Sequence, residues 1–145
     1  QMCIRDRDYH ETAGTRDFSA FLAVPYCIDF MNKYDWVEKR SFCQAKTLEW
    51  AQIFQSYFRF KSIAPIDEAF IGQMYSIPIE TEDVAGLKSL LYERFHIEVP
   101  VFTSNSQVFI RFSYQVFNSD QDMQRLFDAM KTLKAEGYFK IEKFE

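Results

Sequence analysis

The sequence predicts an α/β protein of the α+β kind, with helices first and then the order β-α-β-β-α. Runs of alternating apolar residues indicate three strands in the second half of the chain, and apolar residues spaced three to four apart indicate the helices. The 145 residues, 48% of them hydrophobic and 18% aromatic, suffice for one core of ordinary size. A sheet of so few strands buries its apolar face only under helices. We therefore expect a small antiparallel or mixed sheet covered by helices.

The first half of the chain is expected to be helical. Asp17 is placed to cap a first helix, and Pro25 is expected to restart or kink it, because proline is tolerated best in a first helical turn. A longer helix is predicted from about Asp35 to Phe58, a stretch without glycine or proline. Its apolar residues are spread widely around the helix, so we expect it to be covered on more than one side.

Two strands and a helix are predicted in the middle of the chain. Residues 74–79 alternate as a strand does, and Pro78 favours an edge position because proline donates no ladder hydrogen bond. Residues 84–95 carry one helical apolar stripe. Residues 97–101 alternate again, and the polar residues 103–106 are predicted to form the turn that follows.

The clearest pattern is the strand at residues 107–116. One of its faces is wholly apolar, with Val108, Ile110, Phe112, Tyr114 and Val116. Ser119 is expected to cap a last helix, with Asp120 and Asp122 favoured near its positive end. Gly137 is a suitable helix stop.

Composition excludes several classes of protein. Lys and Arg number 17 against 21 Asp and Glu, a net charge of −4, which argues against a broad surface for nucleic acid. Cys3, Cys27 and Cys43 form no CxxC pair, so we expect no disulfide framework, thiols buried at Cys27 and Cys43, and a cytoplasmic location. His10 and His96 lie far apart, and no metal site is expected. We also expect no membrane anchor and no signal peptide.

Two features could carry chemistry. Residues 12–15, Thr-Ala-Gly-Thr, precede a helix start, where backbone N–H groups favour an anion, although general rules favour a plain turn with a helix cap. Arg111 lies on the face of its strand opposite the apolar residues. If both sheet faces are covered, its guanidinium needs a carboxylate or phosphate partner, whereas alternation alone favours a solvated arginine.

Three segments, in this order, resemble the class V aminotransferases over about residues 8–135. The segment that opens the C-terminal part of that family resembles Gly14-Thr15-Arg16-Asp17, Ala20-Phe21-Leu22-Ala23-Val24-Pro25 and Ile28-Asp29-Phe30. A segment of the isopenicillin N epimerase-like branch is similar to Ile97-Glu98-Val99-Pro100-Val101. The family's ending, an arginine before a Tyr-Asn-Thr-like helix start, is similar to Ile110-Arg111-Phe112-Ser113 followed by Phe117-Asn118-Ser119 and Asp122.

The resemblance implies a fold-type I enzyme that uses pyridoxal 5′-phosphate (PLP). It implies that Gly14 and Thr15 contact the cofactor phosphate, usually that of the neighbouring subunit in a homodimer, and that Arg111 binds the α-carboxylate of an amino-acid substrate. The lysine that links to the cofactor lies upstream in this family. We therefore expect no catalytic residue in this chain, which should be inactive alone.

The resemblance also divides the chain. Residues 1–7 resemble translated adapter sequence and are taken as a non-native leader, and residues 8–34 lead out of a large PLP domain that the chain lacks. Residues 35–137 form the small C-terminal domain, and residues 138–145 form a tail.

Several interpretations stay open. Transamination, epimerisation and other PLP outcomes are not separated by these residues, and neither is the substrate side chain. Cysteine desulfurases carry their nucleophilic cysteine shortly before the arginine, and residues 96–110 contain no cysteine, which disfavours desulfuration. The alternative from another class is a stand-alone α/β binding or interaction module in which Thr15 and Arg111 are structural.

Overall fold

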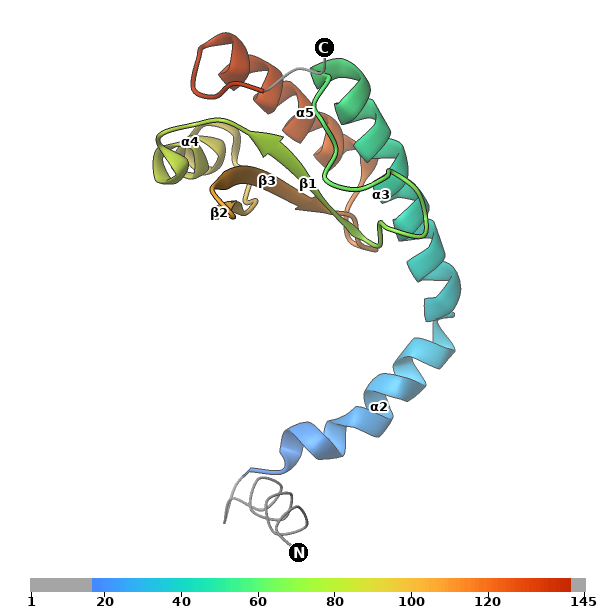
Figure 1. Cartoon of the computed structure of the whole chain (residues 1–145). Coiled ribbons are helices and arrows are strands. Elements are labelled where there is room, and N and C mark those ends of the chain that lie inside the picture. Colours follow the sequence, from blue (N-terminus) through green and yellow to red (C-terminus); the bar gives the residue numbers. More distant parts are fainter. Residues whose placement is uncertain (1–16, 142–145) are drawn as a thin grey trace, which may run out of the picture. The chain divides into compact units, whose positions relative to one another are not determined.

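A computed structural model describes residues 17–141 (Figure 1). The chain divides into two compact units, residues 1–36 and 37–145. The elements are α2 (Ser19–Lys33), α3 (Trp36–Phe58), β1 (Met74–Ile79), α4 (Val84–Phe95), β2 (Val101–Ser104), β3 (Gln107–Ser113) and α5 (Asp120–Ala135). This order confirms the predicted fold class, since helices come first and β-α-β-β-α follows.

Helix α2 is the described element of the first unit. Asp17 accepts a hydrogen bond from the backbone N–H of Ser19 at 2.9 Å, although the N-cap position itself is Phe18, one residue later than predicted. Pro25 does not restart the helix: α2 runs through it to Lys33, because one proline removes a single backbone hydrogen bond and the flanking turns persist, and the alternative of a kink stays a prediction. Cys27 is exposed rather than buried, since α2 buries none of its residues.

The second unit is built on an antiparallel sheet with strand order β1-β3-β2. Pro78 therefore lies on an edge strand, as predicted. Tyr75, Ile77 and Ile79 of β1 pair with Phe112, Ile110 and Val108 of β3, so the apolar residues of both strands share one face. Side chains of α3, α4 and α5 join this face in one core cluster.

An aromatic cluster joins α3 to the sheet. The ring of Phe54 lies 5.3 Å from that of Phe112 and 5.5 Å from that of Phe127 on α5. Helix α3 buries one side only, with Cys43, Thr47, Trp50, Ala51, Phe54 and Phe58. Val37 and Phe42 are exposed, which corrects the expectation of cover on more than one side, because the sheet and α5 offer a single packing surface within the described residues.

The β2–β3 hairpin differs from the prediction. Strand β2 begins at Val101 rather than residue 97, and the turn is only Asn105 and Ser106, which have φ values of 48° and 63°. Positive φ at both central residues is typical of a two-residue hairpin turn, which lets both strands continue up to it. Thr103 and Ser104 consequently pair with Val108 and Gln107 instead of forming the turn.

The ends of α5 follow the predicted signals. Ser119 and Asp122 form a capping box, and Gly137 adopts a φ of 86° just beyond the helix. Backbone bonds from Gly137 to Lys134 and from Tyr138 to Leu133 complete the stop. Beyond it, Phe139 and Ile141 are buried, so residues 138–141 contribute to the core.

Asp120, the first residue of α5, connects that helix to α3. Its Oδ1 accepts a hydrogen bond from Trp50 Nε1 at 3.0 Å, and its Oδ2 accepts one from Lys46 Nζ at 2.8 Å. These donors, Lys46 foremost, hold the pKa of the Asp120 carboxyl below its ordinary value. The carboxylate thus stabilises the packing of α5 on α3 while it is ionised.

We predict a pH-dependent loss of stability for Asp120→Asn. Because folding lowers the pKa, the charge stabilises the fold above the ordinary value near 3.8, and this contribution is lost as the pH falls through the lowered pKa. The variant should lose about 0.5–1 kcal/mol at pH 7 and match the wild type in strong acid. Urea unfolding of the variant and the wild type at several pH values measures the loss at pH 7 and the agreement in strong acid. Glu93→Gln, which removes one exposed negative charge on α4, is the matched control.

Candidate functional site

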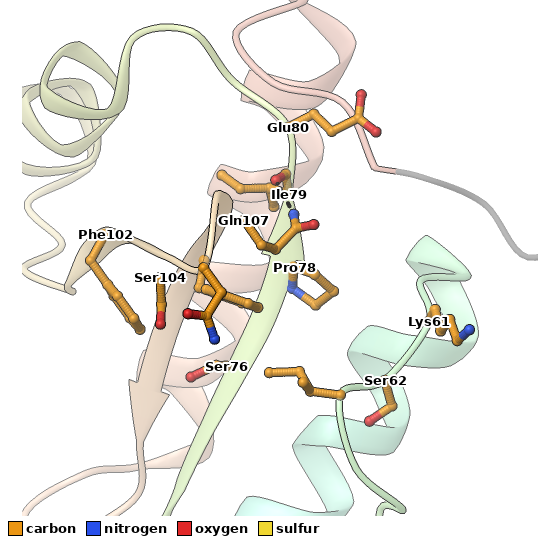
Figure 2. Close-up of a pocket in the computed structure, with 12 residues that line it drawn as sticks. Lys61, Ser62, Ser76, Pro78, Ile79, Glu80, Phe102, Ser104 and Gln107 are labelled. Carbon is orange, nitrogen blue, oxygen red and sulfur yellow. Dashed lines mark hydrogen bonds between the residues drawn. The ribbon is translucent and has the colours of Figure 1, made fainter.

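The second face of the sheet carries the candidate site. Alternation places Ser76 and Pro78 of β1 on this face, opposite Arg111 and Phe109 of β3, with Phe102 of β2 opposite Phe109. Ser76, Pro78, Phe102 and Phe109 of this face line a hollow of about 610 Å³, and Arg111 lies outside that lining. Figure 2 shows Lys61 and Ser62 on one side of the hollow and Phe102 and Ser104 on the other.

Arg111 is half-buried in the middle of β3. Its backbone N–H donates to the carbonyl of Pro100 at 3.0 Å, and its guanidinium carbon lies 5.5 Å from the ring centroid of Phe102. No ion pair or side-chain hydrogen bond among residues 17–141 uses the guanidinium. A planar fork of donors is therefore available to an incoming carboxylate or phosphate.

A second hollow, of about 310 Å³, lies where residues 96–100, the end of β3 and the start of α5 meet, and Arg111 lines it. Three of the other polar side chains around it are engaged. Asn118 Oδ1 accepts from the backbone N–H of Gln115 at 2.9 Å, and Arg125 donates to the Phe95 carbonyl at 3.4 Å. Asp122 bonds to Ser119, and those bonds lower the pKa of its carboxyl. Of the two guanidinium groups that line this hollow, that of Arg111 makes no hydrogen bond or ion pair among residues 17–141.

His96, which also lines the smaller hollow, closes helix α4. It adopts a left-handed conformation with a φ of 56°, and its N–H bonds to the Tyr92 carbonyl while that of Ile97 bonds to Leu91. This geometry is a helix stop of the kind that glycine usually forms. The backbone role accounts for the histidine without any chemistry of its ring.

The predicted site residues fall into two groups. Arg111 lies on the open sheet face, half-buried and without an acidic partner among residues 17–141. It is therefore neither a fully solvated arginine nor a covered arginine that is already paired with a carboxylate. Gly14 and Thr15, the predicted phosphate contacts, lie outside the described residues. Asn118 and Ser119 build the entry to α5, as their place before the last helix suggests.

Sequence reasoning missed Phe102. Alternation ends at residue 101 and residues 103–106 are predicted as the turn, so the sequence pattern alone gives Phe102 no partner across the sheet. The signal lies in Asn105-Ser106: a two-residue turn there sets Phe102 opposite Phe109 and diagonal to Arg111 on the same face.

Two kinds of feature are absent among the described residues, a cluster of metal-ligating side chains and a membrane-spanning helix. Residues 17–141 contain no group of three or more His, Cys, Asp or Glu side chains arranged to hold a metal ion. Among the helices over the same range, none has the length and apolar character that crossing a bilayer requires.

The fold of this chain recurs in a solved structure. The structure is similar to 8-amino-7-oxononanoate synthase from Francisella tularensis, with a TM-score of 0.56 and 24% identity over 76% of this chain and 32% of that one. At this level the likeness concerns the fold alone, an α/β arrangement that the described part of this chain shares with part of that protein.

Sequence comparison then gives the family. No family model matches the chain. The chain is 28% identical over 142 residues to a probable L-cysteine desulfhydrase from Arabidopsis thaliana, and 30% identical over 125 residues to the isopenicillin N epimerase of Amycolatopsis lactamdurans. These matches take in 86% and 85% of this chain but only 30% and 31% of those proteins, so the chain spans about a third of its relatives' length. It is a homologue of the C-terminal portion of class V aminotransferase-like enzymes, which confirms the resemblance.

The two faces of β3 should respond differently to truncation. Arg111→Ala removes a side chain that makes no hydrogen bond among residues 17–141, so the free energy of unfolding should fall by less than about 1 kcal/mol. Phe112→Ala empties a buried position beside Phe54 and should cost about 3–5 kcal/mol. Urea unfolding of both variants measures the contrast. A large loss in Arg111→Ala would show that the arginine supports the fold instead of a ligand.

Proposed function

We propose that this chain is the C-terminal part of a PLP-dependent enzyme that acts on an amino acid, and that Arg111 binds the α-carboxylate of the substrate. The observation that carries the proposal is the guanidinium of Arg111, half-buried on the open sheet face and without an acidic partner among residues 17–141. The homology to class V aminotransferase-like enzymes supports the same role.

The chemistry of Arg111 suits this task. A guanidinium offers parallel N–H donors that match the two oxygens of a carboxylate, and it stays protonated at any physiological pH. Partial burial strengthens such a charge-assisted pair, because less water competes for the donors. By holding the carboxylate, Arg111 orients the amino acid, and PLP, when bound, supplies the electron sink for the bond that breaks.

Gly14 and Thr15 carry a separate proposal, for the cofactor phosphate. A glycine lets the backbone approach a phosphate, the threonine hydroxyl adds a donor, and both precede the start of a helix, where N–H groups favour an anion. We propose that they contact the PLP phosphate of the neighbouring subunit in a homodimer. We also propose a cytoplasmic enzyme, on the basis of the free thiols of Cys27 and Cys43.

The names of the relatives bear on the substrate class. One relative is named for L-cysteine and another for isopenicillin N. The lack of cysteine in residues 96–110 argues against an enzyme-borne thiol nucleophile before Arg111. It does not exclude the amino acid cysteine as the substrate. We therefore propose an amino-acid substrate, with transamination, epimerisation or another PLP-dependent outcome as the reaction.

Replacement of Arg111 tests the proposal in the full-length enzyme. Arg111→Ala should lower kcat/KM for the amino-acid substrate. The loss of transition-state stabilisation should be about 3–5 kcal/mol, because a carboxylate loses its charged partner. Arg111→Lys should already be damaging, since a point charge replaces the fork. The matching amine without a carboxylate should lose far less. Equal losses for both substrates, measured by steady-state kinetics, would remove Arg111 from the site.

Thr15→Ala tests the phosphate contact separately. The change deletes one charge-assisted hydrogen bond, so PLP should bind the full-length enzyme more weakly by roughly 1.5–3 kcal/mol, with a smaller effect on substrate affinity. Cofactor affinity is measured by titrating PLP into the apoenzyme and following its absorbance. Thr132→Ala, on α5, is a matched control that removes a hydroxyl bonded only to its own helix. Unchanged PLP affinity in Thr15→Ala would make residues 12–15 a helix cap.

A further inference from the structure

The guanidinium of Arg111 is held by an aromatic ring from the neighbouring strand. Phe102 pairs directly with Phe109, and Arg111 lies two residues beyond Phe109, so Phe102 and Arg111 are diagonal neighbours on one sheet face. The guanidinium carbon lies over the Phe102 ring, 5.5 Å from its centroid. This separation is within the range at which a cation is attracted to an aromatic face.

The Phe102 ring is itself supported by a second ring, that of Phe109 on β3. It packs against the ring of Phe109 with centroids 5.7 Å apart, and Phe109 is only 8% exposed. Both rings lie outside the core cluster that α3, α4 and α5 form on the other sheet face. They therefore make a separate two-ring platform whose described contacts lead to Arg111 rather than to the core.

Arg94 shows by contrast what is unusual at Arg111. Its guanidinium also lies over an aromatic ring, that of Phe95, at 5.1 Å. Both of its terminal nitrogens, however, donate to the carboxylate of Glu136, one of them at 2.7 Å. The guanidinium of Arg111 likewise lies over a ring, that of Phe102, but it pairs with no carboxylate among residues 17–141. An aromatic face attracts the cation while leaving the in-plane N–H groups available, which suits a residue that must receive its carboxylate from a ligand.

We infer that Phe102 is a positioning residue: its ring, backed by Phe109, holds the Arg111 guanidinium in the orientation that receives the substrate carboxylate. The inference rests on the proposed function of Arg111 and adds a determinant of substrate affinity on β2. A flexible arginine loses side-chain entropy when it binds, and a platform that fixes it beforehand lowers that cost. Phe102 acts through Arg111 and need not touch the substrate.

The test is steady-state kinetics of the full-length, PLP-loaded enzyme with Phe102→Leu. Loss of the cation–π contact should raise KM for the amino-acid substrate about 3- to 30-fold, with kcat at saturation changed less than about twofold. Phe102→Tyr keeps the ring face and should restore KM to within about twofold of the wild type. In an Arg111→Lys background, Phe102→Leu should add much less than it does alone, because the two changes remove one interaction.

Two controls separate this inference from the function on which it rests. Phe95→Leu removes the ring that Arg94 contacts and should leave KM unchanged. A normal KM in Phe102→Leu, beside a raised KM in Arg111→Lys, would overturn the role of Phe102 and leave Arg111 as the carboxylate ligand. A normal KM in Arg111→Lys would overturn the proposed function itself. Equal losses in Phe102→Leu for the carboxylate substrate and the amine lacking it would show general damage and overturn the inference.

Discussion

The contact between Phe112 and Phe54 fixes which way β3 faces. The two rings lie 5.3 Å apart in the core, and Phe112 is almost completely buried. Because successive side chains of a strand point to opposite faces, this contact obliges Arg111 to point away from the helices. This apolar contact thereby places Arg111, the one charged side chain of β3, on the open face.

That arrangement separates stability from ligand binding within a single strand. Helices α3, α4 and α5 bury one face of the sheet, and the network around Asp120 connects two of those helices. The other face lines the larger hollow and carries an arginine whose donors are available, and the smaller hollow lies at the end of β3 beside the start of α5. A half-buried cation without an acidic partner is unfavourable in a surface that needs only to be stable, and its presence is the kind of local conflict that marks a binding site.

Much of this fold could be predicted from local patterns. The strands around Ile77 and Ile110, the helix stripe through Leu87 and Leu91, and the signals at Ser119 and Gly137 all act over a few residues, and the structure follows them. Failures occurred where tertiary context decides. Cys27 and Phe42 are apolar in helical patterns yet exposed, because periodicity does not say which faces are covered.

The candidate site was predictable in part for the same reason. Arg111 could be assigned to a face by alternation, but its ring partner depends on the register between two strands, which the length of the hairpin turn sets. A turn over residues 103–106 would leave Phe102 outside the ladder, whereas the two-residue turn at Asn105 and Ser106 pairs Phe102 with Phe109 and makes it a neighbour of Arg111. Gly14 and Thr15 lie outside residues 17–141 and stay predictions.

The turn at Asn105 and Ser106 has a consequence for how this domain tolerates change. Surface loops usually accept insertions and deletions with little effect. Here one added residue that shifted the pairing of β2 would move every β2 side chain to the opposite face and carry Phe102 away from Arg111. The shortest loop of the sheet is therefore the place where a change of length would disturb ligand recognition most, so homologues that keep this arginine should vary in the residues of the turn and not in their number.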